Sequence, residues 1–342
     1  MKIPQPKQLP SGKWRVQIMV DGARQSRTFE TEAEALHYVT GVKTKMAEAE
    51  VSPSSKTVRE AAEAYIEASR VVLSPSTIAG YVKIKDTRLG ILEHVRIRDL
   101  TQEQIQRWVN AMKKAGKSPK TISNAHGFLS TILKQTRPSM RLTTKLPQKQ
   151  KKEVRIPSEE DIRKIMEAAK GTRYEFPFAL AIWLGLRASE IIALTRDSIQ
   201  GEYLTVRTAM VLDEDGDLVS KDPKTYSGFR KIHLPPEVLA LVPDTKRPDG
   251  RLVPRTGGAL YKALQRTCEK AGVQPCSFHA LRHANASVML ANGVPDKYAM
   301  KRMGHATTNM LKTVYQHTMQ DKETQVATQV EEAIRALLNP GK

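Results

Sequence analysis

Two histidines flank an arginine in the stretch "SFHALRHANASVML", residues 277–290, which has the composition of a helix. His279 and His283 are four residues apart, and Arg282 shares their helical face. Histidines at this spacing can bind a metal ion, but a permanently charged guanidinium beside them would repel it, and the glutamate of an HExxH motif is missing. Arginine instead offers a planar fork to two phosphate oxygens, and imidazole can transfer a proton. The stretch favours an anion site over a metal site, with a buried histidine and a salt-bridged arginine as the alternative.

Other reactive side chains lie along the same part of the chain. "WLGLRASEI" places Arg187 after an apolar run, where a charge needs a partner or a ligand. "KDPKTYSGFRKIHLP" predicts a hairpin with Lys224 near its tip, and "MGHATTNMLKTVYQH" contains His305 and, ten residues later, Tyr315. Taken singly, a hairpin lysine is usually solvated and a tyrosine usually packs in a core. No one of these motifs settles the chemistry by itself.

The order of these motifs resembles that of the tyrosine recombinase, or phage integrase, family over the last part of the chain. The matching motifs are "GLRASEI", "PKTYSGFRKIHLP", "HALRH", "GH" and "VYQH". The resemblance implies that His283 is a supporting residue. It implies a catalytic set made of Arg187, Lys224, His279, Arg282, His305 and Tyr315.

The resemblance also implies the reaction, which is site-specific DNA recombination through a 3′-phosphotyrosine intermediate and a Holliday junction. Tyr315 would attack a DNA phosphate whose non-bridging oxygens are held by the two arginines. Lys224 would protonate the departing 5′ oxygen, His279 would assist proton transfer and His305 would donate to the phosphate. No metal, cofactor or ATP is expected, because guanidinium groups neutralise the phosphate and the covalent intermediate retains the energy of the broken bond.

The composition agrees with a nucleic-acid partner and argues against a membrane protein. The chain has 342 residues, of which 55 are Lys or Arg and 36 are Asp or Glu, giving a net charge of +19. The longest apolar run, residues 176–186, is shorter than the roughly 18 residues of a membrane span, and the opening residues contain no apolar leader. Cys268 and Cys276 form no CxxC pair. We expect a cytoplasmic, DNA-associated protein of a bacterial host.

The length favours two or three domains, and residues 1–50 read as the first. Alternating apolar residues from Trp14 to Val20, an Asp21-Gly22 turn and a helical stretch capped by Thr31 predict a short antiparallel sheet crossed by one helix. This pattern resembles the arm-site DNA-binding domain of integrases from phages and conjugative transposons. Its open face would be a DNA-binding surface or a solvated face, formed by Lys13, Arg15, Gln17, Arg24 and Arg27.

Residues 56–137 follow a Ser- and Pro-rich linker and predict a four-helix domain. N-caps are expected at Ser76, Thr101 and Ser118. Residues 51–150 carry 18 basic and 7 acidic side chains, so the positive charge is concentrated here. The segment resembles the core-site DNA clamp of the family, although a charged surface can also be merely solvated. We expect DNA contacts at Lys83, Lys85, Lys117 and Lys120.

A basic connector, residues 143–157, leads to a mixed α+β catalytic domain, residues 155–342. It should contain an apolar helix around 175–194, several strands and an amphipathic tail at 321–338. The whole chain is therefore expected to be multidomain and mainly α with small β elements. The tail either packs on its own domain or, as the resemblance implies, docks on a neighbour in a homotetramer that holds two DNA duplexes. An excisionase and a host DNA-bending protein are further implied partners.

Two other functions use the same features. A type IB topoisomerase-like enzyme would relax DNA with the same chemistry, and a catalytically silent DNA-binding regulator would use only the scaffold. The two additional DNA-binding segments favour recombination over relaxation, and the presence of all six expected side chains favours an enzyme.

Overall fold

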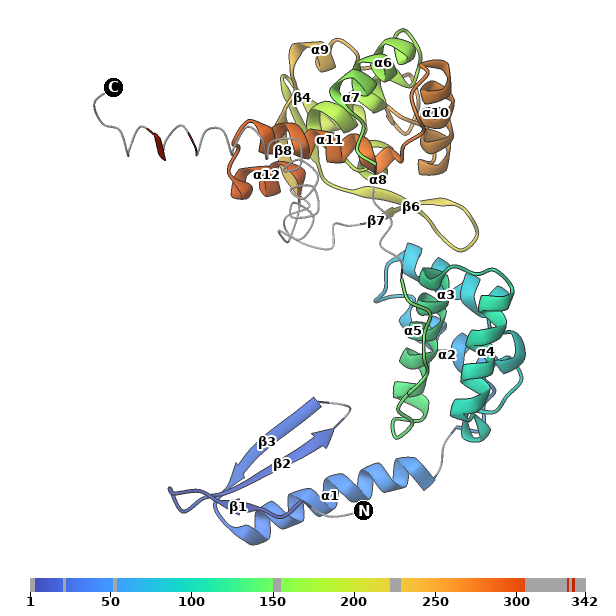
Figure 1. Cartoon of the computed structure of the whole chain (residues 1–342), viewed down its shortest axis with the longest axis vertical. Coiled ribbons are helices and arrows are strands. Elements are labelled where there is room, and N and C mark those ends of the chain that lie inside the picture. The colour runs from blue at the N-terminus through green and yellow to red at the C-terminus, as the bar shows by residue number, and fades with distance from the viewer. Residues whose placement is uncertain are drawn as a thin grey trace. The chain divides into compact units, whose positions relative to one another are not determined.

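The computed structural model describes residues 4–20, 23–51, 54–149, 155–221 and 229–304, together with residues 331, 334 and 335. The chain divides into two compact units, residues 1–151 and 152–342. It is mainly helical with small sheets, as predicted (Figure 1). Within the described ranges no helix is long and apolar enough to cross a membrane.

The chain begins with an antiparallel sheet in the order β1-β2-β3 and one helix packed against it: β1 (Lys7–Gln8), β2 (Trp14–Val20), β3 (Ala23–Phe29) and α1 (Glu32–Val51). The predicted alternation is present, since Val16 and Ile18 are buried in one cluster with Ala35 and Val39 of the helix. The helix begins as predicted at Thr31, whose hydroxyl accepts the Glu34 amide.

The register of this sheet divides the side chains that were expected on its open face. Arg27 pairs with the buried Val16, so it lies on the helix side, where its guanidinium is 5.1 Å from the ring centroid of Tyr38. The expectation that it lies on the open face is wrong, because it is one residue out of phase with its neighbours in β3. Lys13 forms an ion pair with Glu30. The remaining three of the set lie on the open face: Arg15, Gln17 and Arg24.

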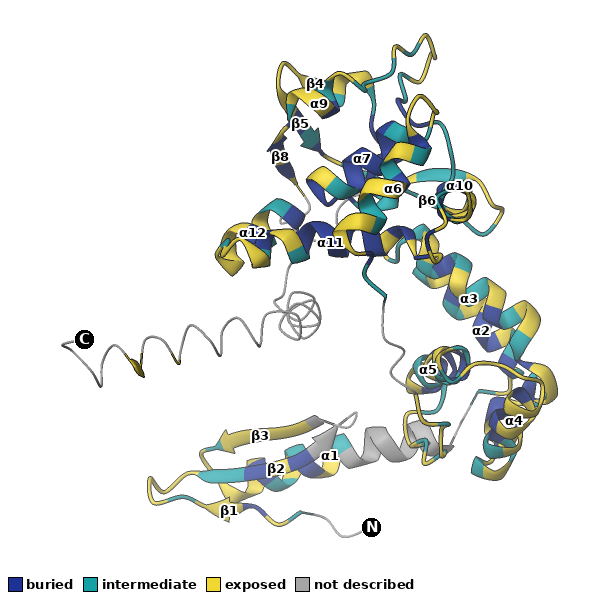
Figure 2. Ribbon diagram, turned by 45° about the horizontal axis from the view of Figure 1, so that its top comes forward, coloured by how far each residue is buried: buried dark blue, intermediate teal, exposed yellow. Residues whose placement is uncertain are grey.

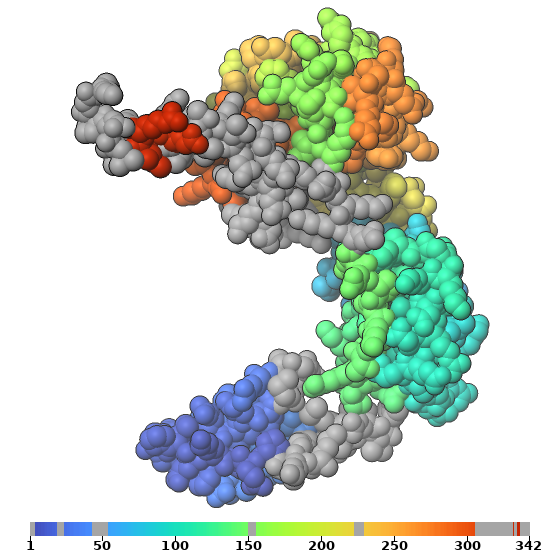
Figure 3. Space-filling view, in the orientation of Figure 1, coloured from blue at the N-terminus to red at the C-terminus, as the bar shows by residue number. Residues whose placement is uncertain are grey.

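Four helices form the second part of this unit: α2 (Val58–Ser69), α3 (Pro75–Arg88), α4 (Gln102–Lys114) and α5 (Pro119–Thr136). Two short 3₁₀ turns, η1 (Gly90–Leu92) and η2 (Ile97–Asp99), connect α3 to α4. The helices share one apolar core that contains the fully buried Trp108, and they make a compact body coloured cyan to green in Figure 3. The caps at Thr101 and Ser118 are confirmed. Ser76 is not a cap, because Pro75 fixes the first helical position and Ser74 precedes it.

Residues 141–149 follow α5 and are fastened to α4 by two glutamine side chains. The Gln102 amide accepts the backbone N–H of Thr143 at 3.2 Å and donates to a backbone carbonyl of the same segment. Gln106 accepts the N–H of Lys145 at 2.9 Å and donates to its carbonyl at 3.2 Å. Each glutamine side chain thus satisfies one backbone N–H and one backbone carbonyl, as a neighbouring β-strand would. The first part of the predicted connector therefore belongs to the helical body.

The second unit contains seven helices, one 3₁₀ turn and five strands within its described ranges. The helices are α6 (Glu159–Ala169), α7 (Glu175–Leu184), α8 (Ala188–Ile191), α9 (Pro236–Leu239), α10 (Gly257–Lys270), α11 (Phe278–Ala291) and α12 (Asp296–Met303). The strands are β4 (Ile199–Gln200), β5 (Tyr203–Val206), β6 (Ala209–Leu212), β7 (Leu218–Lys221) and β8 (Arg230–His233), with η3 (Arg196–Ser198) before β4. They form a three-stranded sheet, β4-β5-β8, and a β6-β7 hairpin.

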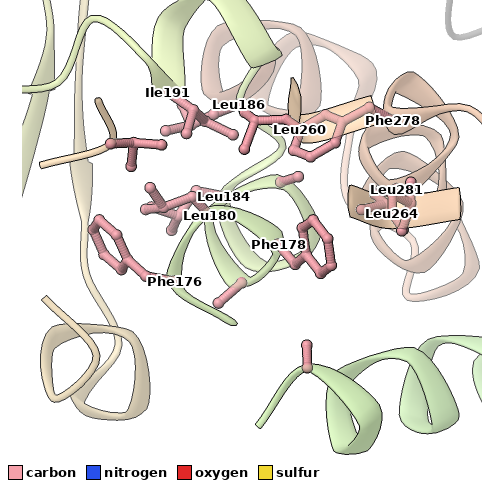
Figure 4. Packing of buried hydrophobic residues seen from close by; sticks show 14 of the residues in the cluster. Phe176, Phe178, Leu180, Leu184, Leu186, Ile191, Leu260, Leu264, Phe278 and Leu281 are labelled. Carbon is pink, nitrogen blue, oxygen red and sulfur yellow. The ribbon is translucent and has the colours of Figure 1, made fainter. Parts of the chain in front are cut away.

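The central helix of this unit is α7, which is largely buried in Figure 2. Its side chains and those of the flanking helices α10 and α11 form one apolar cluster, and Figure 4 labels Phe176, Phe178, Leu180, Leu184, Leu260, Leu264, Phe278 and Leu281. Burial on this scale accounts for the continuous apolar sequence of α7, since no face of it needs to be polar.

The helix expected around 175–194 is in fact two helices, because Gly185 ends α7 in a left-handed conformation with φ +64°. The chain then turns through Arg187 into α8. A Cβ on Gly185 would lie 2.9 Å from Asn285 Oδ1. Glycine is therefore required at this position both by the backbone conformation and by the space available.

We expect Gly185→Ala to destabilise the protein by about 2–4 kcal/mol, because it combines left-handed strain with a steric clash. Gly201→Ala is the matched control, since its φ is +55° and no atom lies within 4 Å of the added Cβ. Urea unfolding of both variants measures the difference. Equal losses of stability would contradict the clash with Asn285.

We expect the double variant Gln102→Ala/Gln106→Ala to release residues 141–149 from α4. Trypsin should then cleave after Arg141 and Lys145 at least about 10-fold faster, because several backbone hydrogen bonds are lost. The exposed Gln135→Ala on α5 serves as the control. Cleavage at the parent rate would show that the glutamines do not hold the segment.

Candidate active site

The carboxylate of Glu190 is the centre of a cluster of charged side chains. It is 5% exposed and accepts four hydrogen bonds, two from Arg187 and two from Arg230. A guanidinium nitrogen of Arg282 lies 4.0 Å from Glu190 Oε2. Burial alone would raise the pKa of Glu190, but hydrogen bonding and the positive charge of Arg230 and Arg187 outweigh it and lower the pKa to about 2. We call these four residues the arginine cluster.

Arg187 is the member of the arginine cluster that reaches solvent, since its side chain is 35% exposed. It stands at the N-cap of α8, where its backbone N–H donates to Glu190 Oε2 at 2.9 Å. Its guanidinium donates to Glu190 Oε1 at 2.7 Å and to the carbonyl of Gly304 at 3.0 Å. The break in the helix at Gly185 is what turns this arginine toward the cluster.

Arg282 lies on α11 and is completely buried. Its guanidinium donates to the backbone carbonyls of Gly185 and Met303, and its Nε has no hydrogen-bond partner among the described residues. Burial, followed by the charge of Arg187, lowers its pKa to about 9, so it remains charged at pH 7. In this conformation Arg282 supplies positive charge from beneath the surface, while Arg187 offers the accessible group.

The two histidines of α11 have different environments. His283 is buried, whereas His279 lies on the exposed side of the helix, with the two rings 4.6 Å apart at 84°. Surrounding protein, then the charges of His283, Arg282 and Arg187, lower the pKa of His279 to about 4. His279 is thus neutral at pH 7 and can accept a proton. No group of three metal-ligating side chains occurs in the described part of the chain.

Three of the six catalytic residues expected from the sequence lie in the described part of the chain. Arg187 and Arg282 approach the Glu190 carboxylate, at 2.7 and 4.0 Å, and His279 lies one turn before Arg282 on α11. The other three lie outside the described residues: Lys224, His305 and Tyr315. The predicted tail helix, residues 321–338, is also largely outside them.

Sequence reasoning gave no role to Arg230, the first residue of β8. It is 6% exposed and donates to both oxygens of Glu190, at 3.1 and 2.7 Å. Its Nε donates to the carbonyl of Arg302 at 3.0 Å. A signal was available, because the alternation of "RKIH" places Arg230 on the same buried side of the strand as Ile232. A charge on that side requires a buried partner.

The lysines expected to contact DNA differ in how available they are. Lys85 is 18% exposed and pairs with Glu63 at 3.6 Å and Asp86 at 3.1 Å. Its charge is therefore partly compensated within the helical body. Three others are exposed: Lys83, Lys117 and Lys120.

Comparison with known proteins points to the same family as the sequence motifs. Residues 229–322 match the model of the phage integrase family. A tyrosine recombinase XerC-like protein of Caldanaerobacter subterraneus subsp. tengcongensis is 25% identical over 275 residues, covering 67% of this chain and 70% of the relative. The ICEBs1 integrase of Bacillus subtilis is 20% identical over 269 residues, covering 70% and 72%.

Two solved structures show the same fold. The integrase of transposon Tn1549, in complex with transposon right end DNA, has a TM-score of 0.63 at 18% identity and covers 80% of this chain and 100% of that one. A lambda integrase dimer bound to a COC′ core site has a TM-score of 0.58 at 16% identity and covers 91% and 94%. The match to the family model, the two relatives and the shared fold all support a tyrosine recombinase of the phage integrase type.

The pKa of Glu190 predicts how acid affects stability. Because the folded value of about 2 is below the ordinary value of 4.5, ionised Glu190 stabilises the folded state above about pH 5, and this contribution of roughly 3 kcal/mol is lost as the pH falls toward 2. Urea unfolding between pH 7 and pH 3 should show a shallower acid dependence for Glu190→Gln than for the parent. The exposed Glu237→Gln should keep the parent slope. An unchanged slope in Glu190→Gln would rule out this linkage.

Proposed function

We propose that this protein is a site-specific DNA recombinase that cuts and rejoins DNA through a covalent bond to Tyr315. The observation that carries the proposal is the arginine cluster, whose three guanidinium groups and one carboxylate together have a charge of +2. A buried or half-buried cluster with excess positive charge attracts an anion, and the DNA backbone offers a phosphodiester at every step. Arg187 is the group through which such a phosphate can be reached.

In this reaction the phosphate oxygens lie against Arg187, and the charge of Arg282 adds to the field from below. Both charges interact more strongly with the transition state, in which negative charge builds up on the phosphoryl oxygens, than with the starting phosphodiester. Tyr315 attacks phosphorus, forming a 3′-phosphotyrosine bond as the 5′ oxygen leaves. Attack by the 5′ hydroxyl of a second duplex reverses the step and joins the exchanged strands.

The protons are moved by three further side chains in this proposal. Lys224 protonates the departing 5′ oxygen, and His305 donates to the phosphate. His279 assists proton transfer as a neutral imidazole, which its pKa of about 4 supports. Guanidinium groups supply the charge neutralisation in this scheme.

The remaining parts of the chain would bind DNA. We assign core-site binding to the helical body, residues 56–137, with contacts at Lys83, Lys117 and Lys120, and a smaller contribution from the ion-paired Lys85. Arm-site binding is assigned to the open face of the N-terminal sheet, with Arg15, Gln17 and Arg24. A homotetramer on two duplexes, with an excisionase and a host DNA-bending protein, completes the recombination complex. A cytoplasmic, DNA-associated location follows from this activity.

We expect the parent protein to form a covalent adduct with a nicked duplex that carries the junction sequence flanking its gene. Tyr315→Phe should form none, because the nucleophilic oxygen is missing, whereas Tyr298→Phe, which alters an exposed tyrosine of α12, should react normally. Denaturing gel electrophoresis detects the adduct. Its absence in the parent would indicate a DNA-binding regulator rather than an enzyme.

A second duplex distinguishes recombination from topoisomerase activity. A recombinase transfers the cut strand to a partner duplex with a matching site, and a type IB topoisomerase-like enzyme relaxes supercoiled DNA without one. Relaxation in the absence of strand exchange would contradict the proposed function.

A further inference from the structure

We propose that Arg230 is a positioning residue for strand cleavage, which holds Arg187 and the end of α12 in their reactive arrangement. The inference rests on the proposed recombinase function and assigns a role to a residue outside the catalytic set. Arg230 begins β8, directly after the segment in which the sequence places Lys224.

The contacts of Arg230 connect elements that are far apart in sequence. Two of its nitrogens donate to the two oxygens of Glu190, 40 residues earlier, and the third donates to the carbonyl of Arg302, 72 residues later. This uses the rigid, planar geometry of guanidinium, which a lysine cannot reproduce. With its side chain only 4% exposed, Arg230 is held in one position.

The contact with Glu190 affects Arg187 directly. The same carboxylate accepts the backbone N–H and the guanidinium of Arg187. Arg230 keeps this buried carboxylate ionised and fixes its plane. Without Arg230, burial would raise the pKa of Glu190, and a protonated Glu190 would bind Arg187 less firmly.

The contact with Arg302 affects the other side of the site. The carbonyls of Arg302, Met303 and Gly304 each accept a hydrogen bond from a different member of the arginine cluster, respectively Arg230, Arg282 and Arg187. These are the last carbonyls of α12 and its C-cap, and cations are favourable at such a helix end. His305 follows immediately in the sequence. The arginine cluster thus fixes the point from which the segment carrying His305 and Tyr315 departs.

A purely structural role and a positioning role for Arg230 predict different effects of its substitution. Loss of a structural pair lowers stability, and activity then falls only with the folded fraction. Loss of a positioning residue lowers the cleavage rate of molecules that are folded and bind DNA, since small displacements of catalytic groups have large effects on rate. The two roles also differ in pH dependence. Among the described residues, the charged and titratable groups that face Glu190 are Arg187 at the N-cap of α8, Arg230 of β8, and Arg282 and His279 of α11. Arg230 donates two side-chain hydrogen bonds to Glu190, whereas the Arg187 side chain donates one.

The test compares the full-length parent with Arg230→Gln, Arg230→Lys and the control Arg251→Gln. Arg251 is a 19% exposed arginine of the same unit that forms its ion pair with Asp249 rather than with Glu190. Single-turnover cleavage of the nicked duplex, DNA affinity and thermal unfolding are measured for each protein from pH 5 to pH 8. We expect Arg230→Gln to cleave about 100-fold more slowly at pH 8 with nearly unchanged DNA affinity.

As the pH is lowered, the ratio of the Arg230→Gln rate to the parent rate should fall further, because loss of Arg230 raises the pKa of Glu190 in the variant. Arg230→Lys keeps the charge, so it should retain a constant ratio while cleaving more slowly than the parent. If Arg230→Gln does not fold, the cleavage rate of Arg230→Lys relative to the parent tests the inference instead. Arg251→Gln should cleave at nearly the parent rate.

Parent-like cleavage by both Arg230 variants would overturn the inference, as would a rate loss that matches the unfolded fraction and does not depend on pH. Failure of the proposed function would give a different result, because the parent itself would then form no adduct with the same DNA.

Discussion

The second unit depends on the burial of one carboxylate, that of Glu190, among three guanidinium groups. An isolated buried charge is costly, but Glu190 has four hydrogen bonds and two paired cations, so its ionised state is favoured despite burial. The three arginines also need Glu190. Their positive charges would repel one another, and the negative charge of Glu190 between them allows α8, β8 and α11 to pack with these arginines close together. The arginine cluster can thus retain excess positive charge in the folded protein.

Sequence patterns identified the residues whose roles are indicated by their near neighbours in the sequence. His279 and Arg282 share a helical face by their spacing alone, and Arg187 was indicated by its position after an apolar run. The family resemblance placed them in one site, and in the structure Arg187 and Arg282 both approach the Glu190 carboxylate, at 2.7 and 4.0 Å. Local spacing was sufficient here because helix geometry does not depend on the rest of the chain.

Features that depend on distant contacts were not predicted. The importance of Arg230 arises from partners 40 and 72 residues away, which no local pattern contains. The helix expected at 175–194 is interrupted because Gly185 adopts a left-handed conformation beside Asn285 of α11. Arg27 was assigned to the wrong face because the register of β2 and β3 places it opposite the buried Val16, which the composition of β3 alone does not reveal. Net charge also did not identify which lysines are available to DNA, since the charge of Lys85 is partly compensated by Glu63 and Asp86.

The glutamine contacts of α4 change where the helical body ends. Composition placed that end at residue 137, yet Gln102 and Gln106 bind the backbone as far as Lys145. A fragment cut at 137 would leave both side chains without their backbone partners and would uncover the surface beneath the missing segment. A fragment that keeps all of these contacts must therefore extend at least to Lys145, eight residues beyond the boundary that composition gave.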